Sequence, residues 1–145
     1  MLLLMAVMMT NVQNANAQWT TANLSVARSG LSATTIGTKV FFAGGTDASN
    51  VQSSVVDIYD NSTGLWTTAN LSVARSFLGA TTVGTKVFFA GGRAGSYLHA
   101  QFFSVVDIYD NGTGLWTTAN LSVARNGLST TAKLFLRVVV MLYLV

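Results

Sequence analysis

The sequence has 145 residues, half of them hydrophobic, which suits one ordinary domain with enough apolar material for a core. Only 9% of the residues are charged and the formal net charge is +3, with no basic stripe, so nucleic-acid binding is not expected. The chain contains no cysteine, which excludes disulfides, thiol catalysis and cysteine metal sites within it.

The first 17 residues have the pattern of a secretory signal. An apolar run from Leu2 to Met9 is followed by a polar stretch that ends in Ala15-Asn16-Ala17. Cleavage before Gln18 would leave small residues at the first and third positions ahead of the cleavage site, as signal peptidase requires. We therefore predict a signal peptide over residues 1–17 and a secreted or extracellular product. No basic residue precedes the apolar run, and a start inside a longer protein or a buried strand stays open as an alternative. The run is shorter than the roughly 20 residues that cross a bilayer, so no membrane span is expected.

The strongest pattern in the chain is an internal repeat. Residues 19–45 and 66–92 are identical except at the pairs Gly30/Phe77, Ser32/Gly79 and Ile36/Val83. Residues 54–75 and 104–125 differ only at Ser62/Gly112. The tryptophans Trp19, Trp66 and Trp116 recur 47 and then 50 residues apart. A period of about 50 residues predicts a propeller blade or another stacked array, in which each unit buries its faces on its neighbours.

Each unit is predicted to contain four short strands. In the first unit we expect them at residues 31–36, 39–43, 54–59 and 65–71, because these segments are rich in Val, Phe, Ile and Thr. Gly37-Thr38 and the run from Asp60 to Gly64 have the composition of turns. Residues 40–43 do not alternate between polar and apolar, which indicates a strand that is covered on both faces, as in stacked blades.

These features together resemble the kelch repeat family. The resemblance rests on a hydrophobic strand that closes on a glycine pair, on a Tyr followed by a Trp, and on an Arg that leads into the next unit: Gly44-Gly45, Gly91-Gly92, Tyr59, Tyr109, Trp66, Trp116, Arg28, Arg75 and Arg125. It implies an all-β fold, a partial kelch-type β-propeller with about two four-stranded antiparallel blades plus flanking strands. The repeats are expected over residues 18–131, with blade one at about 31–71 and blade two at about 78–121.

An arc of two blades is an open structure, whereas kelch propellers usually have six or seven blades. Radial closure is what removes exposed sheet edges, so an open arc leaves apolar blade faces in water. We therefore expect a fragment of a longer propeller, self-association through the open blade faces, or a defective product. Residues 132–145 replace the third glycine-ended strand, and one choice of codons in a shifted frame restores Lys-Val-Val-Leu-Ala-Gly-Gly. We interpret them as an aberrant, frame-shifted and aggregation-prone tail, with an edge-closing strand as the alternative.

Function is expected on the face that carries the loop after the second strand and the link between units. The two near-identical units diverge in these loops, residues 46–53 and 93–103, and loops on a rigid scaffold are the usual place for recognition. The candidate ligand-binding residues are Arg28, Arg75, Arg125, Asp47, Asn50, Arg93, Tyr97 and His99. For the three repeated arginines, a structural hydrogen bond between blades to strand-end carbonyls is the alternative.

No catalytic, cofactor-binding or metal-binding residue is assigned, and no cofactor is expected. One histidine without cysteine is a poor ligand set for a metal, and no set of nucleophile, base and orienting group can be assembled. Asn61 and Asn111 each begin an Asn-x-Thr sequence in an expected turn, so they are the candidate glycosylation sites.

Kelch propellers are known as protein-binding platforms, and the resemblance implies a similar role here. The expected product is a secreted binding or scaffold module, a truncated piece of a longer propeller, that recognises a protein or a glycan through its loops and is not an enzyme. The alternative is the blade region of a larger extracellular oxidase similar to galactose oxidase, or of a carbohydrate-active enzyme, whose catalytic residues are missing from this chain.

Overall fold

A computed structural model describes residues 20–128, apart from the side chain of Tyr97. The predicted signal peptide at 1–17 and the predicted aberrant tail at 132–145 lie outside the described residues. Within the described part, the chain forms antiparallel sheets and one short 3₁₀ turn, and no helix there is long and apolar enough to cross a membrane.

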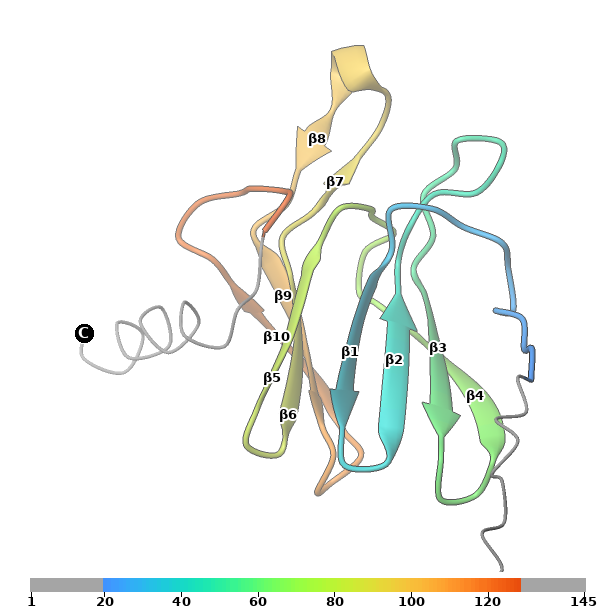
Figure 1. The fold of residues 1–145 in the computed structure, drawn as a ribbon. Helices are drawn as coiled ribbons and strands as arrows, with labels where there is room; N and C mark the ends of the chain where they lie inside the picture. The colour runs from blue at the N-terminus through green and yellow to red at the C-terminus, as the bar shows by residue number, and fades with distance from the viewer. Residues whose placement is uncertain (1–19, 129–145) are drawn as a thin grey trace, which may run out of the picture.

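Two four-stranded antiparallel sheets make up the fold (Figure 1). The first contains β1 (Ser32–Ile36), β2 (Lys39–Ala43), β3 (Val55–Asp60) and β4 (Leu65–Asn70) in chain order. The second contains β5 (Gly79–Val83), β6 (Lys86–Ala90), β9 (Val105–Asp110) and β10 (Trp116–Asn120) in the same relative order. The predicted fold class, two four-stranded blades of a partial propeller, is confirmed, and the strands of the first unit begin and end within one residue of their expected positions.

The loop after β6, residues 93–103, is more structured than the sequence predicts. It forms a small hairpin, β7 (Arg93–Ala94) paired with β8 (Gln101–Phe102), closed by the 3₁₀ turn η1 (Tyr97–His99). We call residues 93–103 the β7–β8 arm. It projects beyond the ends of both sheets (Figure 1).

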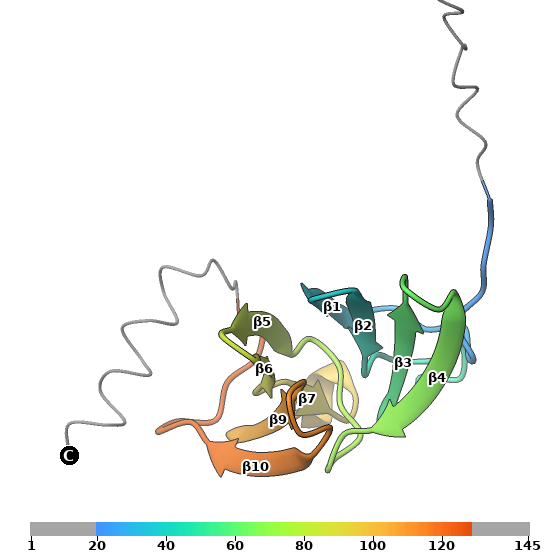
Figure 2. The same cartoon turned by 90° about the horizontal axis from the view of Figure 1, so that it is seen from below.

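The two blades meet along their first strands, β1 and β5. The Thr34 hydroxyl lies 3.1 Å from the Thr82 hydroxyl, Thr82 also donates to the Thr35 carbonyl at 2.7 Å, and Ser32 donates to the Leu78 carbonyl at 2.6 Å. From this contact the two sheets run in different directions, so they form a wedge (Figure 2). This is the arrangement of two neighbouring blades around a propeller axis.

The core lies between the sheets and depends on Phe41. This side chain is fully buried, with its ring 6.3 Å from that of Phe89 and 5.2 Å from that of Tyr109. Phe89 in turn stacks on Trp116. Each blade therefore gives one face to its neighbour, as the repeat predicts.

Blade one presents the equivalent aromatic pair on its other face. Phe42 stacks on Trp66, whose side chain is 40% exposed, whereas the matching Phe89 in blade two is fully buried. The same residues are thus buried where a preceding blade covers them and half-exposed where no described residue does. Self-association through such a face stays a prediction.

Replacing Phe41 by Ala is expected to lower the free energy of unfolding by about 3–5 kcal/mol, because it opens a cavity between the blades. Phe42→Ala, on the other face of the same strand, is the matched control and should cost at least about 1 kcal/mol less, because Phe42 is only half-buried. Urea unfolding followed by tryptophan fluorescence measures both. Equal losses would contradict an interface centred on Phe41.

Candidate functional site

The two divergent loops lie at one end of the sheets, opposite the β1–β2 and β3–β4 turns (Figure 1). Backbone bridges anchor each loop to the segment that leads into its blade, Ser29 with Thr46 and Ser76 with Arg93. A hydrogen bond from the Gly95 amide to the Gln52 side chain, 3.2 Å long, joins the two loops. We call this end the loop face. It brings both loops together, as the sequence predicts from strand order.

The first loop is held in shape by Asp47. Its carboxylate accepts hydrogen bonds from the Ser49 and Val51 amides, both at 2.9 Å, which is the local turn that an Asp side chain favours. Asn50 is exposed and has a positive φ of 62°. Of the two candidate residues in this loop, Asn50 offers its side chain to solvent, while Asp47 also stabilises the backbone.

The β7–β8 arm carries the other loop candidates. Leu98 and His99 are exposed in the 3₁₀ turn, and Leu98 is 83% exposed. His99 has no metal partners, because the described residues contain no cluster of three or more His, Cys, Asp or Glu side chains. Tyr97 lies in the same turn, and Arg93 lies at the base of the arm.

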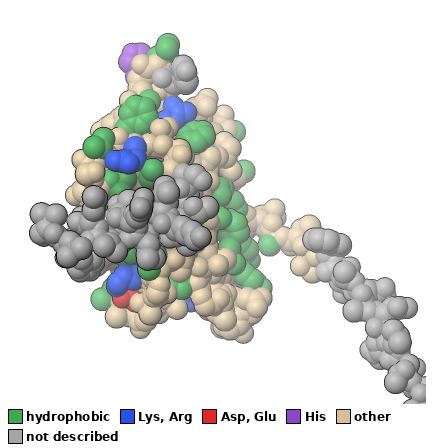
Figure 3. Space-filling view, turned by 60° about the vertical axis from the view of Figure 1, so that its left-hand side comes forward, with side chains coloured by type: hydrophobic (Ala, Val, Ile, Leu, Met, Phe, Trp, Pro, Cys, Tyr) green, Lys and Arg blue, Asp and Glu red, His purple; other side chains and the backbone are tan. Residues whose placement is uncertain are grey.

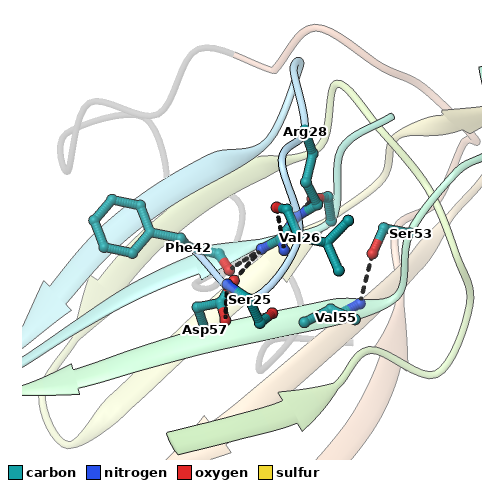
Figure 4. A network of polar contacts seen from close by, with 8 residues as sticks. Ser25, Val26, Arg28, Phe42, Ser53, Val55 and Asp57 are labelled. Atoms are coloured by element: carbon teal, nitrogen blue, oxygen red, sulfur yellow. Dashed lines mark hydrogen bonds and ion pairs between the residues drawn. The ribbon is translucent and has the colours of Figure 1, made fainter. Parts of the chain in front are cut away.

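Arg28 is buried in a polar network inside blade one (Figure 4). Its guanidinium donates to the Gly44 carbonyl at 2.7 Å and to the Phe42 carbonyl at 3.1 Å, and it lies 2.7 Å from the Asp57 carboxylate. The Asp57 side chain also accepts from the Ser25 amide. The hydrogen-bonding groups of Arg28 are therefore used within the protein.

Arg75 repeats this arrangement in blade two. It donates to the Gly91 carbonyl at 2.7 Å and to the Phe89 carbonyl at 3.0 Å, and it lies 2.8 Å from the Asp107 carboxylate, with its side chain 0% exposed. Both arginines bind carbonyls at the end of a second strand, but they do so in the blade that they precede rather than between blades. We call Arg28–Asp57 and Arg75–Asp107 the blade ion pairs.

The main chain of Arg75, in contrast, joins the blades. The Gly45 amide donates to the Arg75 carbonyl at 3.0 Å, and the Gly92 amide donates in the same way to the Arg125 carbonyl at 2.8 Å. A Cβ added at Gly44 would stand 2.4 Å from the Arg75 carbonyl oxygen, and Gly44 has a φ of 67°. Gly44 is therefore required because the next unit's backbone approaches too closely for a side chain, whereas a Cβ at Gly45 would stand 2.8 Å from the Ser29 carbonyl oxygen of its own unit.

Arg125 differs from the other two arginines because its side chain is exposed. It donates to the Val123 carbonyl at 3.2 Å and has no carboxylate partner among the described residues. Of the three repeated arginines, Arg125 alone presents its guanidinium to solvent in the described part of the chain.

The surroundings of the blade ion pairs shift their pKa values. Burial alone would raise the pKa of Asp57, but hydrogen bonds from Ser25 and Arg28 and the charge of Arg28 outweigh it and hold that pKa below its ordinary value. Burial lowers the pKa of Arg75, and the Asp107 carboxylate opposes this shift. Arginine titrates so far above neutrality that Arg75 remains charged.

A hollow of about 490 Å³ opens on the loop face beside the arm. It is lined by Phe77, Arg93, Ala100, Phe102 and Asn126. Of these residues, only Arg93 is among the ligand-binding candidates predicted from the sequence. Phe77 could have been found from the exchange with Gly30 inside an otherwise identical stretch.

The two candidate glycosylation sites differ in their surroundings. Asn61 is exposed in the β3–β4 turn. Asn111 is half-buried beside Gly37 of blade one, and its side-chain oxygen accepts a hydrogen bond from Lys39 at 3.2 Å. Glycosylation stays a prediction at both, and the geometry makes Asn61 the more accessible acceptor.

Comparison with known proteins identifies the repeat. The Kelch motif model matches residues 27–70 and 74–120. Among solved structures, the chain is similar to one titled "Structure of YjhT", with a TM-score of 0.65 and 16% sequence identity. That match covers 75% of this chain but only 37% of the other, so this chain spans well under half the length of the protein it matches. No curated protein matches the chain.

Replacing Arg75 by Met is expected to lower the free energy of unfolding by about 3–5 kcal/mol, because it leaves the Asp107 charge buried without its partner. The chain supplies a matched control in Arg125→Met, at the same repeat position but exposed, which should change stability by less than about 0.5 kcal/mol. Urea unfolding of both variants tests this. Similar losses of stability in the two variants would contradict a structural role for the Arg75–Asp107 ion pair.

Stability should also fall in acid as Asp57 becomes protonated. The pKa of Asp57 is lower in the folded chain than in the unfolded chain, where it is about 3.9. Asp57 therefore contributes fully to the free energy of unfolding above the unfolded-state pKa, and this contribution is lost as the pH falls through the folded-state pKa. Asp57→Asn is expected to be less stable at pH 7 and to have a flatter stability profile between about pH 4 and pH 2. Chemical unfolding at a series of pH values measures this, and a variant slope as steep as the parent's would refute it.

Proposed function

The chain belongs to the kelch repeat family, and on that premise we propose that it is a binding or scaffold module rather than an enzyme, recognising a protein or a glycan through its loop face. One observation carries this proposal. The two units are almost identical wherever they build the blades, and they differ in the residues that form the loop face. Such a pattern fits a rigid frame that presents variable loops for recognition.

The physical design of the blades supports the same proposal. The blade ion pairs and the glycine contacts fix the segments from which both loops depart, so the loops start from defined positions. A rigid platform reduces the entropy that binding would otherwise cost. Exposed side chains at Asn50, Leu98, His99 and Phe102 give the face both polar and apolar groups.

We also propose that the product is exported, because residues 1–17 have the composition of a cleaved signal peptide. Recognition would then take place outside the cell. Sequencing the amino terminus of the exported chain tests this, with Gln18 as the expected first residue.

The decisive experiment for binding is a loop exchange. Residues 93–103 are replaced by residues 46–53, so that both blades carry the shorter loop, while circular dichroism and thermal melting monitor the fold. Ligands for the parent are selected from a random peptide library and from a glycan array. We expect at least a tenfold loss of affinity for the selected ligands in the exchanged chain, because each good polar or aromatic contact is worth about that much. Ligands that bind both chains equally would contradict recognition through the β7–β8 arm of the loop face.

A further inference from the structure

Phe77 has a backbone conformation that residues other than glycine rarely adopt. Its φ is 54°, while the equivalent positions in the neighbouring units are Gly30, with a φ of 61°, and Gly127, with a φ of 62°. The three positions are joined by backbone hydrogen bonds, from Phe77 N to Gly30 O at 2.8 Å and from Gly127 N to Phe77 O at 2.9 Å. The left-handed conformation is therefore built into the repeat, and glycine is the residue it favours.

Burial does not compensate for this strain. The Phe77 side chain is 46% exposed, and its ring rests against the backbone of Gly30 on the loop face. A strained and exposed aromatic residue contributes little to the core. Residues held in such conformations are concentrated at functional sites.

Arg93 is a second residue of the hollow that differs from its equivalent in blade one. It occupies the position of Thr46 in blade one, and both residues form the same backbone bridge to the preceding serine. Its guanidinium carbon lies 4.8 Å from the centre of the Phe77 ring. The two residues that distinguish blade two here therefore contact each other.

The Arg93 guanidinium has no carboxylate partner among residues 20–128, in contrast to the blade ion pairs. A guanidinium stacked on a ring keeps its N–H donors at its edge, where a carboxylate can accept two hydrogen bonds. Phe102, 49% exposed, and the exposed Asn126 complete the lining of the hollow. Figure 3 shows basic side chains among apolar ones near this end of the molecule.

We propose that this hollow binds a carboxylate carried by a flat apolar body, such as an aromatic acid. Arg93 binds the carboxylate, and the rings of Phe77 and Phe102 contact the apolar body. The inference rests on the proposed function and names the ligand chemistry of one site on the loop face. The same chemistry is found in a small aromatic acid and at the end of a polypeptide whose last residue is aromatic.

The test uses saturation-transfer NMR to titrate the full chain with N-acetyl-phenylalanine and with its amide, in which a neutral group of similar size and shape replaces the carboxylate. We expect the acid to bind at least about tenfold more tightly than the amide, as a charge-assisted bidentate contact predicts. Phe77→Gly and Arg93→Thr, which restore the residues of blade one, should each weaken binding of the acid at least about tenfold. Asn61→Ala, exposed in the β3–β4 turn at the opposite end of the sheets, is the control and should leave binding unchanged.

Thermal melting separates binding from folding. Phe77→Gly places the favoured residue at a positive φ, and Arg93→Thr keeps the bridge that Thr46 already forms, so neither variant should melt below the parent by more than a few degrees. A three-residue peptide that ends in Phe, with a free or an amidated carboxyl group, distinguishes the two sources. Tighter binding than N-acetyl-phenylalanine points to a polypeptide end, and equal binding points to a small acid.

Any one of three results would overturn the inference. N-acetyl-phenylalanine does not bind, or it binds no more tightly than its amide, or Arg93→Thr binds it as tightly as the parent does. The proposed function is judged separately by the loop exchange. A selected ligand that is lost on loop exchange but kept by Phe77→Gly and Arg93→Thr leaves recognition by the loop face standing and removes this hollow as its site.

Discussion

The arrangement of the blades depends on a charged side chain that is fully buried, that of Arg75. Arg75 sends its guanidinium to the Asp107 carboxylate and to two carbonyls of blade two, while its own carbonyl accepts a hydrogen bond from Gly45 of blade one. A buried charge is tolerated only when it is paired and hydrogen-bonded, so the guanidinium has few alternative positions. One residue therefore fixes both the path of the link into blade two and its distance from blade one.

This constraint explains why the units are so similar where they touch. The ion pair needs Arg and Asp, the close approach of the Arg75 carbonyl needs Gly44, and the buried face needs Phe41 against Phe89. The loops face none of these demands, because they leave the sheets beyond the last ladder hydrogen bonds. The chain thus divides into a part specified by packing and a part that is free to vary.

Most of the fold could be predicted from the sequence, because strand length, turn glycines and the 47-residue period are all visible as patterns. The hydrogen-bond partners of the arginines could not be predicted, because the repetition of Arg indicates a structural role without identifying the carbonyls that it binds. The β7–β8 arm was expected only as a loop, because its pairing joins two residues on each side. The left-handed backbone at Phe77 could not be predicted, because only the difference from Gly30 marks this position in the sequence.

Backbone hydrogen bonds join Gly30, Phe77 and Gly127, the equivalent positions of successive units, in the same way at each step. Each unit offers its successor an acceptor and a covering face that match those it received from its predecessor. A tandem duplication of one unit in the gene therefore adds a blade whose contacts on both sides already exist. The array can change its length in a single genetic step, and a later point mutation in one copy can then acquire a role that its sisters do not share.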